Sequence, residues 1–225
     1  MLFKESLQIK TMSIVLIGDF NPVIIQPFWL ASRKLIREQE AQNAHVEIIH
    51  NELVKFELDW VSIEITKSRF EAKSSQEPYF EPMRDLCIGI YELLRETPIK
   101  SLGINHLLYY AIADEKQFYE FGNRLTPLNN WDEYLTSPKV SQLEIIEEKR
   151  RDGQNGAYRV RIQPSDQPLS TPYGILININ DHFAVDKGES GRNREMISIL
   201  KGAWTESVKR ANEIPEKIYN KIFPQ

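Results

Sequence analysis

The chain has 225 residues, of which 41% are hydrophobic and 27% are charged, and its formal net charge is −4. These values are typical of a globular protein that buries a sizeable core, as one large domain or two small ones. The acidic surplus lies in residues 1–98, whereas residues 99–225 carry equal numbers of acidic and basic side chains. Neither half has the basic surplus typical of a protein that binds through phosphates.

The single cysteine, Cys87, excludes an intramolecular disulfide and favours a reducing compartment. It shares a predicted helical face with Leu86 and Ile90, which indicates a buried, unreactive thiol. The first ten residues lack the apolar core of a signal peptide, and no stretch approaches the roughly 18 apolar residues of a membrane span. We therefore expect a cytoplasmic protein without membrane contact, and no motif predicts a cofactor.

The first half of the chain, residues 1–98, predicts a strand, a helix, several strands and a second helix. Residues 13–20 form an apolar run that ends at an Asn-Pro turn, as a buried strand does. A helix over 27–43 follows, with proline in its first turn. From His45 the apolar residues have a period of two, and their parity shifts near Asp59, which indicates a bulge or turn between strands. A helix over 78–97 closes this half.

The second half, residues 99–225, predicts the same element order. Residues 101–112 are apolar on both faces, as in a central strand. Asp114 is a good N-cap for a short helix through Phe121, after which a loop carries Trp131 and Tyr134.

The remainder of the second half predicts a hairpin, a strand and a long helix. Residues 142–150 and 158–163 form the hairpin, and 173–185 form the strand. A polar loop, Asp186 to Arg192, precedes a helix that Asn193 caps and Pro215 interrupts.

The grouping of strands between helices determines the predicted fold class. Such grouping favours an α+β fold with a mainly antiparallel sheet and helices packed on one face, over a parallel sheet of the Rossmann type. Because the element order occurs twice, we expect pseudo-duplicated halves, 1–98 and 99–225, within one continuous domain.

The first candidate site is the polar face of the strand over 173–185. Asn178, Asn180 and His182 fall on this face, where they either line a ligand pocket or form the solvated side of an amphipathic strand. The solvated side is the favoured interpretation. Their spacing matches no metal-binding pair, so we predict no metal site.

His106 is the second candidate, because it lies among apolar residues of the predicted central strand. A buried histidine with one hydrogen-bond partner is the favoured interpretation, and a catalytic base is the alternative. If His106 acts in catalysis, we expect its pocket to include Asn178, Asn180 and His182.

The predicted hairpin carries the densest group of basic side chains. These are Lys149, Arg150, Arg151, Arg159 and Arg161. They could contact a nucleic-acid backbone. However, Glu144, Glu147 and Glu148 lie on the adjoining strand and can pair with them, which favours a charge-balanced hairpin.

Trp131 and Tyr134 are predicted to lie in a loop, where aromatic side chains more often anchor an interface than fill a core. They are the candidate interaction residues, for a protein partner or for self-association.

Two resemblances extend this interpretation. The segment Leu102-Gly-Ile-Asn-His, the strand that begins Tyr173-Gly-Ile and the helix from Glu195 to Ala211 resemble a sporadically distributed, uncharacterised family of bacterial proteins of similar length. This resemblance implies a bacterial cytoplasmic protein and no particular activity. The doubled element order is also similar to the saddle-like sheet of the TATA-binding fold, a likeness of fold that does not carry function.

Three hypotheses of function follow. The first is a binding or adaptor protein that acts through protein–protein contacts, as a possible dimer. The second is a small-ligand-binding protein or enzyme with a pocket near His106, Asn178, Asn180 and His182. The third, which the charge disfavours, is a nucleic-acid-binding protein that uses the 149–161 hairpin.

Overall fold

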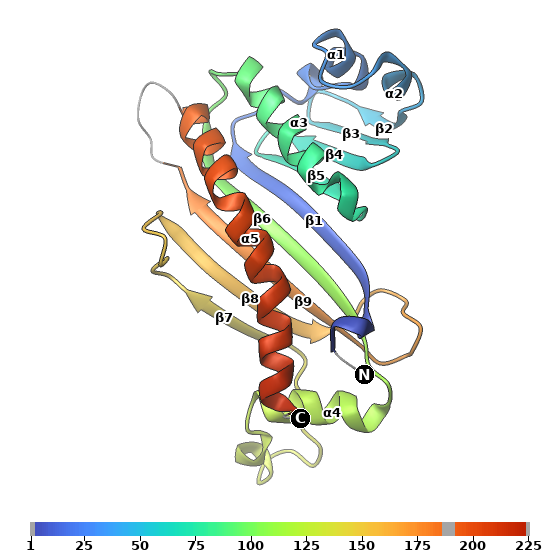
Figure 1. The fold of residues 1–225 in the computed structure, drawn as a ribbon, viewed down its shortest axis with the longest axis vertical. Helices are drawn as coiled ribbons and strands as arrows, with labels where there is room; N and C mark the ends of the chain where they lie inside the picture. The colour runs from blue at the N-terminus through green and yellow to red at the C-terminus, as the bar shows by residue number, and fades with distance from the viewer. Residues whose placement is uncertain (1–2, 186–191, 224–225) are drawn as a thin grey trace.

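The computed structural model describes residues 3–185 and 192–223 (Figure 1). Within them, nine strands form one antiparallel sheet in the order β2-β3-β4-β5-β1-β6-β9-β8-β7. The strands are β1 (Leu7–Gly18), β2 (His45–Ile49), β3 (Leu53–Leu58), β4 (Val61–Thr66), β5 (Arg69–Ser74), β6 (Ile99–Ala111), β7 (Leu143–Glu147), β8 (Gly156–Pro164) and β9 (Gly174–Ala184). The helices are α1 (Pro27–Ser32), α2 (Glu38–Gln42), α3 (Phe80–Leu93), α4 (Glu115–Leu125) and α5 (Arg192–Ile222).

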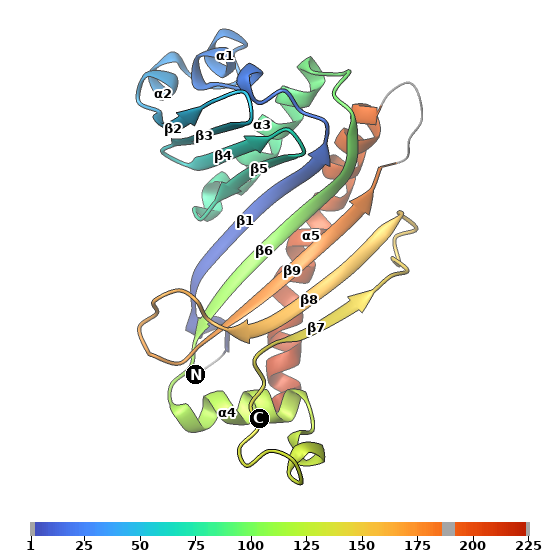
Figure 2. The ribbon, with the colours of Figure 1, turned by 180° about the vertical axis from the view of Figure 1, so that it is seen from behind.

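The helices α3 and α5 lie on one face of the sheet, and the opposite face of the long strands β1, β6, β9 and β8 is not covered by a helix (Figures 1 and 2). The helices α1 and α2 sit at the β2 end, and α4 lies beyond the lower ends of the long strands. This arrangement confirms the predicted α+β fold with a mainly antiparallel sheet. We call the uncovered side the open face.

The sheet is continuous across the two halves of the chain because β1 pairs with β6 at its centre. In each half the last strand pairs with the first, β5 with β1 and β9 with β6. The predicted central position of the strand over 101–112 is therefore correct. The first half contributes one strand more than the second.

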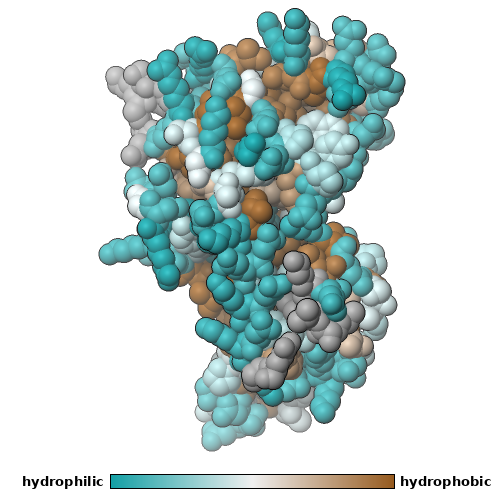
Figure 3. All heavy atoms as spheres, in the orientation of Figure 1, coloured by the Kyte–Doolittle hydropathy of each residue, from teal (hydrophilic) through white to brown (hydrophobic). Residues whose placement is uncertain are grey.

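The hydrophobic core lies between the sheet and the two covering helices. Met12, Ile14 and Leu16 alternate along β1 and are fully buried on the helix side. Burial of each such side chain contributes about 1.5–3 kcal/mol. Cys87 is buried in α3, and this burial raises the pKa of its thiol, in agreement with the predicted unreactive cysteine. Hydrophilic side chains cover much of the outer surface of α5 (Figure 3).

Three local predictions need correction. The helix predicted over 27–43 is two short helices, because Lys34 adopts a φ of 59°, a left-handed conformation that ends α1. Asn193 lies inside α5 and donates its side-chain amide to the carbonyl of Leu94, so it is not an N-cap. Pro215 does not interrupt α5, since the later turns pack against α4 through Tyr219 and Phe121.

Other local predictions are correct. Asp114 caps α4, because its Oδ1 accepts a hydrogen bond from the backbone of Gln117 at 2.8 Å. β7 and β8 form the predicted hairpin. Of the polar loop predicted over 186–192, residues 186–191 lie outside the described residues. Among the described helices, none has the length and apolar character needed to cross a membrane.

Candidate functional site

A shallow polar groove of about 320 Å³ crosses the open face over the strands that meet at the centre of the sheet. We call it the open-face groove. Its lining residues are Val15, Ile17, Arg69, Ser101, Gly103, Asn105, Glu144, Arg159, Arg161, Asn178, Asn180 and His182. The three strand residues singled out from the sequence, Asn178, Asn180 and His182, lie together in it.

Strand register brings the polar side chains of the groove together. Asn105 of β6 stands directly opposite Asn180 of β9, and Asn180 stands opposite Arg159 of β8. Directly opposed residues of antiparallel strands point to the same face of the sheet. These three residues therefore form one row across three strands.

A chain of side-chain hydrogen bonds links the two asparagines of this row to Ser13 of β1. The Nδ2 of Asn180 donates to the Oδ1 of Asn105 at 2.5 Å, and the Nδ2 of Asn105 donates to the Oγ of Ser13 at 3.2 Å. Gly103 leaves space beside the amides, because a Cβ there would lie 3.2 Å from the Nδ2 of Asn180. We call Ser13, Asn105 and Asn180 the amide row.

The polar groups of the groove differ in their availability to a bound molecule. Among the described residues, the guanidinium of Arg159 has no hydrogen-bond or ion-pair partner, whereas Arg161 pairs with Glu144 at 3.0 Å. The Oδ1 of Asn178 and the Nε of Arg161 are buried without a partner in the described structure. A buried polar atom without a partner costs about 1–3 kcal/mol. Because these two atoms are not accessible at the surface, the exposed side chain of Arg159 is the group that a bound molecule can reach.

His182 is the titratable imidazole of the groove. Partial burial, followed by the positive charges of Arg159 and Arg150, lowers the pKa of His182. The ring is therefore neutral at neutral pH, with one nitrogen that donates and one that accepts hydrogen bonds.

His106 does not belong to the groove, which corrects the expectation of one pocket shared with Asn178, Asn180 and His182. It stands opposite Ile179, and both point to the helix side of the sheet. Its Nε2 lies 2.9 Å from the Oγ of Ser207 in α5. Burial, opposed by the charge of Asp181, lowers the pKa of His106 to about 4. It is a buried core histidine with one side-chain partner.

A second polar cluster lies on the helix side. Asp181 is fully buried and pairs with Arg210 of α5 at 2.6 Å. The guanidinium of Arg210 lies 4.6 Å from the ring centroid of Tyr158, whose hydroxyl donates to Asp152 at 2.9 Å. This cluster joins α5 to β8 and β9.

The five basic residues of the hairpin do not form one surface, which corrects the expectation of a shared nucleic-acid site. Arg150 is buried, lies 3.8 Å from the ring centroid of Phe183 and pairs with Asp152. Burial acts to raise the pKa of Asp152, but hydrogen bonds from Arg150, the Gln154 amide and Tyr158 outweigh it and lower the pKa to about 2.

The other basic side chains of the hairpin divide between pairing and exposure. Arg151 pairs with Glu147 at 3.3 Å, and Arg161 pairs with Glu144 across the hairpin, as the charge-balanced interpretation predicts. Lys149 is exposed. Arg159 belongs to the open-face groove.

Trp131 and Tyr134 lie in the segment after α4, and their side chains are 54% and 78% exposed. The backbone amide of Tyr134 donates to the carbonyl of Trp131 at 2.9 Å, which holds them in one turn. The structure thus places both at the surface, in the segment between α4 and β7.

Sequence reasoning missed Asn105 and Arg159 as members of the site. The alternation Leu102, Ile104, His106 places these three residues on one face of the strand and Asn105 on the other. This alternation is the signal that could have identified Asn105. Arg159 was grouped with its neighbours along the chain. Its position beside Asn180 depends on the β8–β9 register.

These features define an α+β protein with an antiparallel sheet, covered by helices on one face and hollowed by a polar groove on the other. Comparison with protein-family models gave no match, and comparison with curated proteins gave no significant match. In the described residues no group of three or more His, Cys, Asp or Glu side chains is placed to hold a metal ion.

Proposed function

We propose that this protein is a non-enzymatic binding protein that holds a segment of a partner protein in its open-face groove. The observation that carries the proposal is the guanidinium of Arg159, which has no partner among the described residues and lies beside the amide row on a sheet face without a covering helix. Asparagine amides both donate and accept hydrogen bonds, as the peptide groups of a partner do.

The charge of the groove favours a partner segment with an acidic side chain. Three arginines and one glutamate line the groove, and Arg69 and Arg161 are paired with Glu71 and Glu144. The charge of Arg159 is therefore left without a counter-charge among the described residues, although the chain as a whole carries a net charge of −4. Arginine binds carboxylates through paired hydrogen bonds. We therefore expect a carboxylate of the partner to lie against Arg159.

Binding is favoured over catalysis by the surroundings of His182. Its ring forms no hydrogen bond to a carboxylate or a hydroxyl among the described residues, and His106 lies on the opposite face. A general base needs such an orienting partner and a nucleophile within reach.

The proposal is tested by affinity purification of the tagged protein from an extract of its native host. The wild type is compared with Arg159→Glu, which reverses the charge of the groove, and with Lys209→Glu, a matched change on the exposed surface of α5. We expect a protein that the wild type and Lys209→Glu retain and Arg159→Glu loses.

Two results contradict the proposal. Equal retention by all three proteins would place the binding surface elsewhere. Loss of all retained material after nuclease treatment of the extract would favour a nucleic-acid partner instead.

A further inference from the structure

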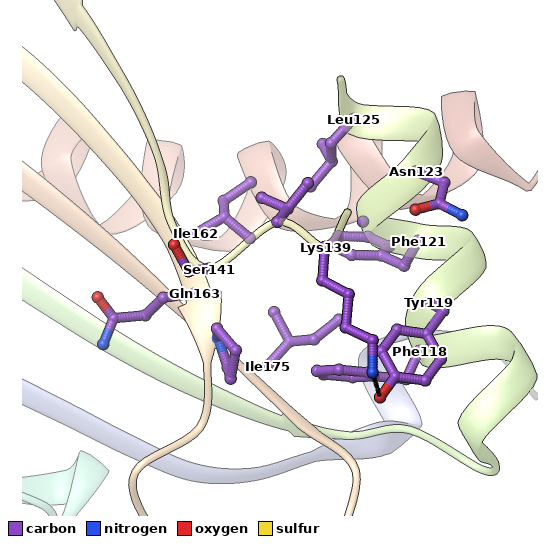
Figure 4. Close-up of a pocket in the computed structure, with 13 residues that line it drawn as sticks. Phe118, Tyr119, Phe121, Asn123, Leu125, Lys139, Ser141, Ile162, Gln163 and Ile175 are labelled. Atoms are coloured by element: carbon purple, nitrogen blue, oxygen red, sulfur yellow. Dashed lines mark hydrogen bonds between the residues drawn. The ribbon is translucent and has the colours of Figure 1, made fainter. Parts of the chain in front are cut away.

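A second cavity, of about 330 Å³, lies between α4, the segment 139–141 and the neighbouring ends of β8 and β9 (Figure 4). It is separate from the open-face groove, with which it shares no lining residue. Its apolar walls are formed by Phe118, Phe121, Leu125, Val140, Ile162 and Ile175. We call it the α4 pocket.

The α4 pocket exists because α4 presents a glycine to the returning chain. Gly122 faces Val140, and a Cβ at this glycine would lie 3.7 Å from the Cβ of Val140. A larger side chain at this position would occupy the space in front of Val140. The aromatic ring of Phe121 stacks with the rings of Tyr219 and Phe223, each at a centroid distance of 6.5 Å. The pocket wall is therefore well supported.

One cation lies at the pocket. The Nζ of Lys139 donates to the hydroxyl of Tyr119 at 2.7 Å and lies 4.2 Å from the centroid of its ring (Figure 4). The hydrogen bond to Tyr119 and the weaker attraction of Tyr119 and Glu115 raise the pKa of Lys139. In the part of the chain that the structure describes, no carboxylate forms an ion pair with this lysine. Its charge is therefore available to a bound anion.

We propose that the α4 pocket binds a small amphipathic carboxylate, with an aromatic or short aliphatic body against the apolar walls and the carboxylate beside Lys139. Ligand pockets of about 300–1,000 Å³ are typically apolar, with a few polar groups that orient the ligand. A single ammonium group at an apolar cavity matches a ligand with one negative charge and an apolar body. Highly charged ligands fit poorly, because the walls would desolvate their other charges.

The proposal is tested by calorimetric titration of the purified chain with three probes that differ only in the head group. Phenylbutyrate carries a carboxylate, phenylbutanol is neutral and phenylbutylamine is a cation. We expect the carboxylate to bind at least about tenfold more tightly than the alcohol, which corresponds to about 1.4 kcal/mol. The amine should bind most weakly.

Two variants connect this preference to the pocket. Lys139→Met removes the charge and keeps the length, so the carboxylate and the alcohol should bind equally well. Lys116→Met is the matched control, because Lys116 is an exposed lysine of α4 that does not line the pocket. It should keep the full preference.

Gly122→Leu fills the cavity and should abolish the binding of both the carboxylate and the alcohol. Thermal unfolding of each variant shows whether it folds, and if Gly122→Leu does not, the comparison of Lys139→Met with Lys116→Met decides alone. The proposal is overturned if the wild type binds none of the probes, or if Lys139→Met keeps the preference for the carboxylate. Unchanged binding in a folded Gly122→Leu variant would also overturn it.

Discussion

The Nδ2 of Asn180 donates a hydrogen bond to the Oδ1 of Asn105, although 75 residues separate them in the chain. Their neighbours Asp181 and His106 point to the opposite face, toward α5. Each of the two strands thus carries a polar side chain of the groove next to a polar side chain that contacts α5. The two kinds of residue should respond differently to mutation.

The amide row should contribute little to stability. Asn180→Ala removes one partly buried hydrogen bond, and we expect a loss of about 1 kcal/mol in the free energy of unfolding, measured with urea. Asn178→Ala is the control, because the Oδ1 of Asn178 has no partner in the described structure. Its removal should leave the free energy of unfolding unchanged or raise it, because a buried oxygen without a partner is lost. A larger loss for Asn178→Ala than for Asn180→Ala would contradict this account of the row.

The Asp181–Arg210 pair should be asymmetric. The carboxylate of Asp181 is fully buried, whereas the side chain of Arg210 is 25% exposed and can reach water. Removal of one partner from a buried pair costs about 3–5 kcal/mol when the remaining charge stays buried. Arg210→Met should therefore destabilise the protein by about 3 kcal/mol in urea unfolding, and Asp181→Leu by less. A larger loss for Asp181→Leu than for Arg210→Met would show that the buried charge of Asp181 does not need Arg210 as its partner.

His106 should make stability depend on pH. Burial, opposed by Asp181, lowers the pKa of His106 from 6.5 to about 4, so the unfolded chain binds the additional proton between these values. The stabilisation is complete above pH 6.5 and is lost as the pH falls toward 4. Between pH 7 and about pH 4.5 the loss should be on the order of 2 kcal/mol.

A variant isolates the contribution of His106. His106→Gln does not titrate, so its free energy of unfolding should fall less between the two pH values than that of the wild type. His182→Gln provides the comparison, because the pKa of His182 is lowered in the same direction but its side chain is less buried. If the wild type and His106→Gln show the same pH dependence, His106 is not the titrating group.

Trp131 and Tyr134 should matter for association and not for folding. Both are exposed, so the double variant Trp131→Ala, Tyr134→Ala should change the free energy of unfolding by no more than about 0.5 kcal/mol. If this surface joins two copies of the chain, sedimentation velocity should show a weaker dimer for the variant than for the wild type. An unchanged dimer would place self-association on another surface.

Local patterns predicted much of the fold. The strand and helix order, the Asp114 cap and the hairpin follow from apolar periodicity and turn residues, which act between near neighbours. The break at Lys34 was missed because a left-handed lysine has no local signal of the kind that glycine or asparagine provides. The continuation of α5 through Pro215 was missed because distant aromatic contacts support the later turns.

Some residues of the candidate site could likewise be predicted from local patterns, and others could not. The sequence by itself determined which side chains share a face of one strand, because alternation is a property of the extended backbone. It therefore placed Asn178, Asn180 and His182 together. Only the tertiary structure decided that Asn105 and Arg159 join them and that His106 does not. Those positions depend on strand register and on which face the helices cover, and both result from packing between segments far apart in the chain.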